Sequence, residues 1–290
     1  MAALPASFSA PPSLPRKMRA QHKYWTTRVF VDQASLYGEV LAALRPAAER
    51  EALGIQRILN EGGIPDRARV VDIACGIGRH IIPLARSGYQ AVGCDFSPGF
   101  IDQARGWARE AALTDRRIRF YVSDYRRIDR TLKWARERPF DAAICIFTSM
   151  GHYGESGDLT VLRSVRRIVR PGGLFVMEMA NRDWILRNYQ PVAVSRASPG
   201  LELHERRWFD PEQSVIHSNW KFYRREGHRK RKVFEQDITV RQYSLHELRS
   251  LLARAGWEYV RSYGGLTTRE PVSLASRRLV VVGRRPGRRS

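Results

Sequence analysis

Long apolar runs are missing from this sequence. The longest, Ala142–Phe147 and Leu279–Val282, are far shorter than the roughly 20 residues that a membrane-spanning helix needs. The first 20 residues contain four prolines but no continuous apolar segment, so they do not resemble a secretory signal peptide. We therefore expect no membrane partner and a cytoplasmic location.

Cysteine is also scarce, with three residues at Cys75, Cys94 and Cys145. An odd number does not build a fully paired disulfide framework, and no two of them form a Cys-x-x-Cys pair that would bind a metal. Each lies in or beside a predicted strand. We interpret all three as free thiols in the core and predict no metal site.

Acidic residues are fewer than basic ones: the sequence has 29 Asp and Glu but 50 Lys and Arg, and the formal net charge is +21. Such a balance is compatible with nucleic-acid binding or with a solvated, arginine-rich surface. The charges are spread along the chain except in segment 224–232, which carries six basic side chains and a histidine between two strand-like runs. Two interpretations stay open for it, an exposed hairpin turn and a phosphate-contacting patch.

The 43% of apolar residues are enough for a packed core, and their spacing changes repeatedly between the strand period and the helix period. Ser97-Pro98, for example, places an N-cap and an N1 proline at the start of a helix. The pattern predicts five strands separated by helices, at residues 69–73, 90–94, 118–122, 141–147 and 174–179. Strands that alternate with helices in this way predict a parallel, doubly wound α/β sheet.

A different pattern begins near residue 182, where 217–223 and 233–240 alternate polar and apolar residues and predict an antiparallel insertion. A capping box, Ser244-x-x-Glu247, then opens a helix, and two final strands follow at 257–263 and 279–282. We predict flexible tails at 1–20 and 284–290, a main domain formed by 21–182 and 242–283, and an antiparallel cap at 183–241.

A glycine loop follows the first strand, with the sequence Asp-Ile-Ala-Cys-Gly-Ile-Gly over residues 72–78. Gly76 and Gly78 let the backbone approach a ligand closely, and the next helix presents free N–H groups at its N-terminus. A dinucleotide fingerprint needs a third glycine, and Ile81 stands at that position. The loop therefore favours an adenosyl ligand without a pyrophosphate.

Acidic residues end the next two strands. Asp95 is placed to accept hydrogen bonds from ribose hydroxyls, although it can also serve as an N-cap acid beside Ser97. Asp124 is placed to accept from an adenine amino group, with Tyr125 covering the ring, although it can also be a turn residue. Ligands of open α/β sheets bind at the carboxyl ends of such strands, so the coincidence of loop and acids predicts one adenosyl site.

With these motifs the sequence resembles the class I S-adenosylmethionine-dependent methyltransferases over residues 35–183 and 240–283. The motifs are 70–80, 93–97, 123–125, 140–143 and the turn Arg-Pro-Gly-Gly at 170–173. The resemblance implies a Rossmann-like methyltransferase fold with a mostly parallel seven-stranded sheet, and S-adenosylmethionine as cofactor. We predict these cofactor-binding residues: Tyr37, Ala74, Cys75, Gly76, Gly78, Asp95, Phe96, Ser97, Asp124, Tyr125 and Ile146.

The stretch after the fourth strand, Phe-Thr-Ser-Met-Gly-His-Tyr-Gly over 147–154, is similar to one in amino-sugar N-methyltransferases of macrolide biosynthesis. By that resemblance the insertion is a cap over a small acceptor. We predict His152 and Tyr153 as catalytic, His152 as a base because imidazole ordinarily titrates near neutrality, and Tyr153 as its orienting or acceptor-contacting neighbour. The alternative is that His152 only lines the pocket. Further acceptor contacts are considered at Asn181, Arg207, Trp208, Asn219, Trp220 and Arg241.

Three functions are compatible with these motifs. The favoured one is methyl transfer to nitrogen or oxygen of a small metabolite or natural-product intermediate. RNA or DNA methylation is the second, supported by the charge, but the fourth strand lacks the Asn/Asp-Pro-Pro-aromatic loop of base amino-methylating enzymes. The third is a non-catalytic adenosyl-binding regulatory protein. The sequence assigns no oligomeric state.

Overall fold

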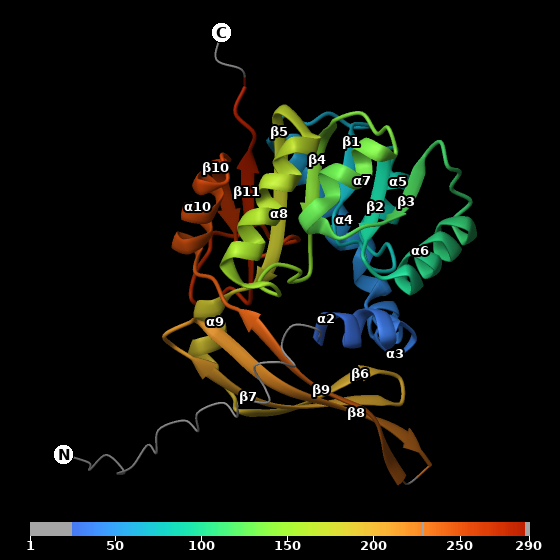
Figure 1. Ribbon diagram of the computed structural model, residues 1–290, viewed down its shortest axis with the longest axis vertical. Coiled ribbons are helices and arrows are strands. Elements are labelled where there is room, and N and C mark those ends of the chain that lie inside the picture. The colour runs from blue at the N-terminus through green and yellow to red at the C-terminus, as the bar shows by residue number, and fades with distance from the viewer. Residues whose placement is uncertain (1–24, 228, 288–290) are drawn as a thin grey trace, which may run out of the picture.

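The computed structural model describes residues 25–227 and 229–287, and its larger part is a seven-stranded sheet (Figure 1). The strand order is β10-β11-β5-β4-β1-β2-β3. Strands β1 to β5 pair in parallel, whereas β11 pairs antiparallel with both β5 and β10. The bounds are β1 Arg69–Asp72, β2 Gln90–Asp95, β3 Ile118–Val122, β4 Phe140–Cys145, β5 Val169–Ala180, β10 Glu258–Tyr263 and β11 Arg278–Arg284. The predicted mostly parallel, seven-stranded fold is confirmed.

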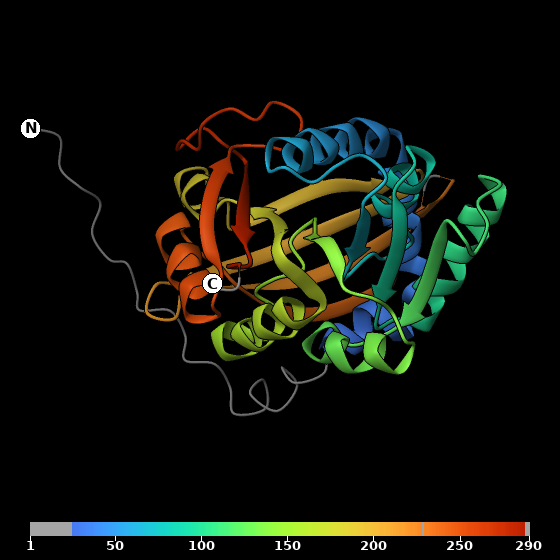
Figure 2. The same cartoon turned by 90° about the horizontal axis from the view of Figure 1, so that it is seen from above.

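Helices cover both faces of this sheet (Figure 2). Successive side chains of a strand point to opposite faces, so Val70 of β1 packs into one core and Val71 into the other, both fully buried. The first core includes α4 (Arg45–Glu61), α5 (Ile81–Arg86) and α6 (Pro98–Glu110). The second includes α7 (Ile128–Trp134), α8 (Gly154–Ile168) and α10 (Leu245–Arg254). Burial on both faces explains why these strands read as continuous apolar runs.

The predicted helix starts at Ser97 and Ser244 are confirmed. Ser97 Oγ accepts a hydrogen bond from the Phe100 N–H at 3.3 Å. The Ser244 side chain accepts from the Glu247 N–H while the Glu247 carboxylate accepts from the Ser244 N–H, which is a complete capping box. Local sequence therefore sets the start of both helices.

The turn predicted at 170–173 needs a correction. Strand β5 already begins at Val169, and Phe140 pairs with Val169 while Ala142 pairs with Leu174. Strand β5 therefore has more residues between these two pairs than β4 has, and the additional residues of β5 form a bulge. Gly172 lies in this bulge and has φ +78°. The Pro-Gly-Gly signal marks this bulge rather than a turn that separates helix from strand.

A second sheet of four antiparallel strands lies beyond the carboxyl ends of β1 to β5 (Figure 1). We call it the cap sheet; it contains β6 (Val192–Ser198), β7 (Leu201–Asp210), β8 (Val215–Glu226) and β9 (Arg229–Arg241). The short helix α9 (Arg182–Arg187) leads into it. The antiparallel insertion is confirmed, but it also contains β6 and β7, which the sequence pattern did not predict. The domain boundaries stay a prediction, and the tail at 1–20 lies outside the described residues.

The basic segment lies at the tip of the β8–β9 hairpin. Two of its lysines are paired with acids of the cap sheet, because Lys230 Nζ lies 2.7 Å from Glu202 Oε2 and Lys232 Nζ lies 2.5 Å from Glu235 Oε2. The hairpin interpretation is therefore correct for this segment. Its contact with phosphate stays a prediction.

A helical segment near the start of the described chain lies between the two sheets (Figure 1). It comprises α2 (Trp25–Thr27), a π-helical turn at Arg28–Asp32 and α3 (Ala34–Ala43). Trp25 and Val29 are buried in one cluster with cap residues such as Phe222 and Ile238. We call residues 25–43 the lid, because they join the cap sheet to the strand ends. Among the described residues, no helix is long and apolar enough to cross a membrane.

Candidate active site

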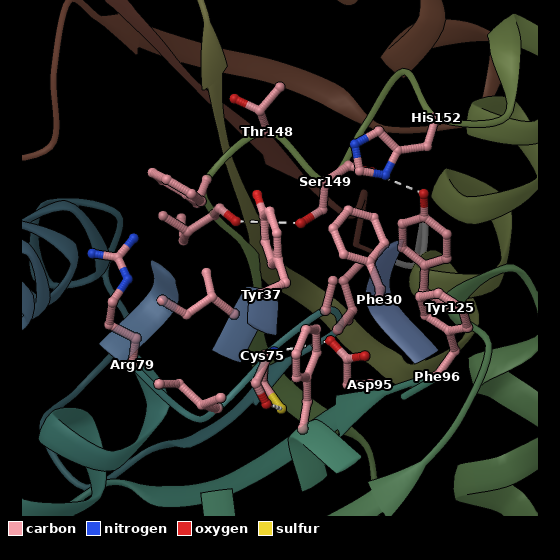
Figure 3. Close-up of a pocket in the computed structure, with 18 of the residues that line it drawn as sticks. Phe30, Tyr37, Cys75, Arg79, Asp95, Phe96, Tyr125, Thr148, Ser149 and His152 are labelled. Carbon is pink, nitrogen blue, oxygen red and sulfur yellow. Dashed lines mark hydrogen bonds between the residues drawn. The ribbon is translucent and has the colours of Figure 1, made fainter. Parts of the chain in front are cut away.

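A cavity of about 270 Å³ lies where the carboxyl ends of the parallel strands meet the lid and the cap sheet (Figure 3). Ten predicted site residues line it: Tyr37, Ala74, Cys75, Gly76, Asp95, Phe96, Tyr125, Ile146, His152 and Tyr153. They come from the lid, from the ends of β1, β2 and β4, and from the loop after β3. The structure therefore brings together most of the residues that the sequence motifs had placed at separate strand ends.

The glycine loop bends tightly at one wall of this cavity. Gly76 has φ +53° and Gly78 has φ +85°, a left-handed conformation that other residues rarely adopt. A Cβ atom at Gly78 would lie 2.7 Å from the Ile82 side chain, so the loop packs directly on α5. Gly76 lines the cavity, whereas Gly78 does not. Gly78 therefore sets the bend of the loop on the side that packs against α5, away from the cavity.

Asp95 joins the glycine loop to the end of β2. Its carboxylate accepts hydrogen bonds from the Gly76 N–H and the Ser97 N–H, each at 2.9 Å. Burial raises the pKa of Asp95 to about 6, although these backbone N–H groups work in the opposite direction. Each carboxylate oxygen keeps a lone pair beyond these bonds, and the side chain faces the cavity. Asp95 can therefore accept further hydrogen bonds from a ligand.

Asp72, at the end of β1, lies behind the same loop. It is almost fully buried, and its Oδ1 atom has no hydrogen-bond partner among the described residues. Burial raises its pKa to about 8, and the nearby Asp95 charge adds to that shift. At pH 7 this carboxyl group is therefore mostly protonated, which limits the negative charge next to Asp95.

Aromatic rings form the walls next to Asp95. Phe30 of the lid meets Phe96 edge to face, with ring centroids 6.3 Å apart, and Tyr37 stacks on Trp220 of β8 at 6.1 Å. The Trp220 indole N–H donates to Glu205, which fixes the orientation of the ring. Burial, with the Glu205 charge, raises the pKa of Tyr37 to about 12. Lid and cap thus supply a flat, uncharged surface suited to a planar ligand.

The loop after β4 is strained where it faces the cavity. Phe147 has φ +70° and Thr148 has φ +62°, and such a conformation costs about 1–3 kcal/mol at each non-glycine residue. Neighbouring contacts hold the bend, because the Phe147 N–H donates to Glu178 and the Ala180 N–H donates to Thr148 Oγ1. The Tyr125 hydroxyl donates to the Ser149 carbonyl at 2.8 Å. A loop held this firmly presents its side chains in fixed positions.

His152 lies against the lid. Its ring stacks on Phe30 with centroids 5.7 Å apart and meets Trp25 edge to face at 5.0 Å. The surface that it exposes belongs to the cavity, and burial lowers its pKa to about 4. The near-neutral pKa expected from its residue type is therefore wrong. At pH 7 the ring is neutral, so one ring nitrogen can accept a hydrogen bond.

Tyr153 points from the same loop toward the lid. Its hydroxyl donates to Thr26 Oγ1 at 3.4 Å, and the Arg126 guanidinium lies over its ring at 3.9 Å from the centroid. Burial raises the pKa of the Tyr153 hydroxyl, against the hydrogen bond with Thr26 and the Arg126 charge. These contacts favour a role in holding the lid. A catalytic role for Tyr153 stays a prediction.

Two other predicted residues lie outside the cavity wall. Asp124 caps the turn after β3 by accepting from the Arg126 N–H, and it forms an ion pair with the Arg126 side chain. Although burial works to raise the pKa of Asp124, the Arg126 hydrogen bonds lower it. Ser97 is fully buried as the cap of α6. Contact of either side chain with the cofactor stays a prediction.

Of the further acceptor candidates, Trp220 alone faces the cavity among the described residues. Asn181 is buried and donates to the Ser273 and Ser276 carbonyls, so it holds the loop before β11. A separate groove on the cap sheet is lined by Arg207, Trp208 and Asn219. Alternation along β8 sends Asn219 and Trp220 to opposite faces of the cap sheet, which explains why these two adjacent candidates line different surfaces.

Several cavity residues were not predicted from the sequence. Phe30 belongs to a short lid segment with no clear period, Arg79 follows the glycine loop, and Arg278 begins β11, where the periodicity shows only the apolar residues. The sequence pattern places Phe147 at the end of a strand, whereas β4 ends at Cys145. The tight glycine loop offered a signal for Arg79, which follows Gly78 directly. Nothing in the local pattern distinguishes Arg278 from other arginines.

A buried carboxylate anchors the loop that carries His152. Asp158 of α8 is fully buried; it accepts from the Gly151 N–H at 3.1 Å and from the Tyr243 hydroxyl at 2.6 Å. The Arg241 N–H donates to the Gly151 carbonyl at 2.9 Å. A Cβ atom at Gly151 would lie only 2.4 Å from the Arg241 carbonyl oxygen. The His152 loop and the exit from the cap sheet are thus fixed to one another.

We expect Tyr243→Phe to lower the free energy of unfolding by about 2 kcal/mol, because a hydrogen bond to a buried charged group is worth about 1.5–3 kcal/mol. Urea denaturation measures this change. Tyr259→Phe is the matched control, since the Tyr259 hydroxyl bonds to Ser262 on its own strand and not to a buried carboxylate of the described chain. Equal stability of the two variants would show that the Asp158 contact contributes nothing.

The cysteines lie within this core. Cys75, Cys94 and Cys145 are buried and free, and burial raises the pKa of each thiol. Over residues 25–227 and 229–287, no group of three or more His, Cys, Asp and Glu side chains is arranged to hold a metal ion. The three side chains pack as small apolar groups.

Comparisons with known proteins agree with this geometry. A family model described as "Methyltransferase domain" matches residues 70–173. The glycine/sarcosine N-methyltransferase of Aphanothece halophytica is 30% identical over 187 residues, which are 59% of this chain and 68% of that protein. Human glycine N-methyltransferase is 30% identical over 143 residues, 47% of this chain and 46% of that one. The chain spans just under half the length of the mammalian glycine N-methyltransferases that it matches.

Solved structures share the fold. An S-adenosylmethionine-dependent methyltransferase from Clostridium acetobutylicum superposes with a TM-score of 0.70 at 14% identity, covering 93% of this chain and 99% of that one. The sugar N-methyltransferase KedS8 from a Streptoalloteichus species superposes with a TM-score of 0.61 at 19% identity, covering 99% of each chain. The chain belongs to the S-adenosylmethionine-dependent methyltransferases. It is an enzyme, and S-adenosylmethionine is its cofactor.

Proposed function

We propose that the protein transfers the methyl group of S-adenosylmethionine to a nucleophilic nitrogen of a small acceptor. The observation that carries this proposal is the cavity between strand ends, lid and cap sheet, whose volume of about 270 Å³ suits small molecules rather than a polymer. The named activities of two similar proteins, a glycine/sarcosine N-methyltransferase and a sugar N-methyltransferase, support nitrogen as the acceptor atom. Transfer to oxygen is the nearest alternative.

We assign the cofactor to the part of the cavity between Asp95 and the glycine loop. Three observations support this fit. The Asp95 carboxylate has spare acceptor capacity for two ribose hydroxyls. Gly76 has no side chain, so the cavity wall is open at that point. The rings of Phe96 and Tyr125 supply a surface for an adenine. Ala74, Cys75 and Ile146 complete the wall.

The chemistry needs little from the protein beyond position and exclusion of water. When bound, S-adenosylmethionine supplies an electrophilic methyl group on a sulfonium. Trp25 and Phe30 of the lid keep water from the strand ends, and the loop at 147–153 faces the acceptor side. We propose that the neutral ring of His152 accepts a hydrogen bond from the acceptor N–H and thereby aims the nitrogen lone pair. The acceptor's proton passes to water after transfer.

Methylation of nucleic acid is the competing function, and the formal net charge of +21 favours it. Two features count against it. The cap sheet covers the strand ends where a base would have to enter, and two lysines of the basic hairpin already pair with cap carboxylates. A small acceptor passes such a cover more easily than a polynucleotide.

A methyl-label screen tests the proposal. Purified protein is incubated with S-adenosylmethionine labelled in its methyl group and with amine metabolite pools, hydroxylated metabolite pools or total RNA. Label transferred to a small amine supports the proposed function. Label found in RNA, with a steep loss of binding as salt increases, would establish the competing function instead.

Cofactor affinity should depend on pH because the pKa of Asp95 is raised to about 6. Binding to ribose hydroxyls favours the charged carboxylate, so protonation of Asp95 opposes binding. The contribution of Asp95 to affinity should therefore be nearly constant above pH 7 and fall about tenfold between pH 7 and pH 5. Isothermal titration calorimetry with S-adenosylhomocysteine measures this. Asp95→Asn is the control and should bind weakly with no such dependence; an equally steep curve for it would assign the titration to another group.

A further inference from the structure

The charged side chains of the cavity wall are separated by sign. Among the lining residues that the structure describes, Asp95 carries a carboxylate, whereas Arg79 and Arg278 carry guanidinium groups. In Figure 3 Arg79 lies on the side of the cavity away from Phe96 and Tyr125. One end of the cavity is therefore acidic and suited to the ribose, and the other is basic.

The two guanidinium groups flank a single ring at the basic end. The Arg79 guanidinium carbon lies 4.9 Å from the centroid of the Phe147 ring and that of Arg278 lies 5.6 Å from it. Phe147 is 40% exposed despite its apolar side chain, and its strained backbone holds it there. Arg278 also donates to Thr148 Oγ1 at 3.1 Å. Strained geometry at this point indicates a constraint beyond folding.

The counter-ions of both arginines lie outside the cavity wall. Arg79 pairs with Glu51 of α4, and Arg278 pairs with Glu178 of β5, where Nη2 lies 2.6 Å from Oε2. Neither glutamate lines the cavity, and Glu178 is only 6% exposed. Within the described residues, the hydrogen bonds of Arg278 use Nε and Nη2 and leave the N–H groups of Nη1 for another partner. The glutamates thus fix both guanidinium groups beside the cavity that the two arginines line.

We propose that Arg79 and Arg278 form an oxyanion-binding subsite that selects an acceptor carrying a carboxylate or phosphate group. The inference rests on the proposed transfer to a small amine and specifies the class of that amine. A guanidinium fork matches the geometry of both anions, and the apolar wall next to it strengthens the attraction by excluding water. The carboxylate of the cofactor has the same chemistry, so the experiment has to separate the two sources.

The test compares acceptors in matched pairs. Glycine is measured against glycinamide, and glucosamine 6-phosphate against glucosamine, with wild-type protein and a double variant, Arg278→Gln with Glu178→Gln. The double change avoids leaving the buried Glu178 charge unpaired. We expect kcat/KM to favour the anionic member of a pair at least tenfold in the wild type, and this ratio to fall to near one in the variant. Arg254→Gln with Glu155→Gln removes an exposed ion pair and is the control.

A binding measurement keeps the proposal testable if none of these amines is methylated. Inorganic phosphate and acetate are titrated into protein loaded with S-adenosylhomocysteine. We expect saturable binding to the wild type and to the control variant, and at least tenfold weaker binding to the Arg278/Glu178 variant. Absence of phosphate and acetate binding to the wild type would overturn the subsite.

The remaining outcomes separate this inference from the proposed function. If the variant binds S-adenosylmethionine tenfold more weakly but keeps its preference for anionic acceptors, the arginines hold the cofactor and the inference fails. If the methyl-label screen finds a neutral amine that is preferred over its anionic analogue, the proposed function holds and the subsite fails. If anions bind through Arg278 but label appears only in RNA, anion binding is established, but its role in selecting an amine fails together with the proposed function.

Discussion

Replacing Asp95 by alanine should weaken the binding of S-adenosylmethionine about a hundredfold. Hydrogen bonds to a charged acceptor contribute about 1.5–3 kcal/mol each, so losing two of them corresponds to at least about 3 kcal/mol. The same carboxylate holds the Gly76 and Ser97 N–H groups, so the glycine loop also loses its anchor. Isothermal titration calorimetry with S-adenosylmethionine measures the change.

Two variants separate the ligand contact from loop damage. Asp95→Asn keeps the size of the side chain and one acceptor oxygen, and we expect it to bind about tenfold more weakly than the wild type. Asp102→Ala removes a carboxylate from the exposed surface of α6 and should bind normally. A dissociation constant for Asp95→Ala within twofold of the wild-type value would refute the ribose assignment.

The second large effect is expected for His152→Phe, which should lower kcat about ten- to a hundredfold at pH 7 and leave cofactor affinity within twofold. Phenylalanine keeps an aromatic ring that can pack on Phe30 and Trp25. It removes the ring nitrogen that accepts a hydrogen bond from the N–H group of the methyl acceptor. His152 orients the acceptor without taking its proton, and a tenfold to hundredfold loss corresponds to about 1.4–2.7 kcal/mol, the size expected for one hydrogen bond that also positions the reacting nitrogen. Single-turnover rates with the amine from the label screen measure the effect.

The pH profile adds a second criterion. Because burial lowers the pKa of His152 to about 4, its ring loses the accepting nitrogen only as the pH falls through that value. The contribution of His152 to kcat should therefore be constant from pH 8 to pH 5. His204→Phe is the matched control and should keep full activity, because His204 of β7 pairs with Glu202, packs on Tyr223 and does not line the cavity. Full activity of His152→Phe would reduce His152 to a lining residue.

Parallel strands were predictable from the sequence because both of their faces are buried. The five predicted strands overlap β1 to β5, and the start of α6 follows from the side-chain chemistry of Ser97. Strands β6 and β7 were not predicted from the sequence. Strand β6 is an edge strand whose Val192 and Val194 are exposed, and β7 is mostly half-buried. Neither strand shows the clean alternation that a half-buried strand needs for recognition.

The cofactor end of the candidate site was more predictable than the acceptor end. Gly76 and Asp95 stand at strand tips, where topology alone brings them together. Arg278 and Trp25 reach the cavity from opposite ends of the chain, and only tertiary packing places them there. The neutral state of His152 likewise follows from the rings around it, which the local sequence does not specify.

A crystal structure of the protein with S-adenosylhomocysteine tests the central claim most directly. We predict that both ribose hydroxyls lie within hydrogen-bond distance of the Asp95 carboxylate, with the adenine between Phe96 and Tyr125 and the sulfur facing the loop at 147–153. Ligand density elsewhere in the molecule, or a ribose without contact to Asp95, would contradict the account.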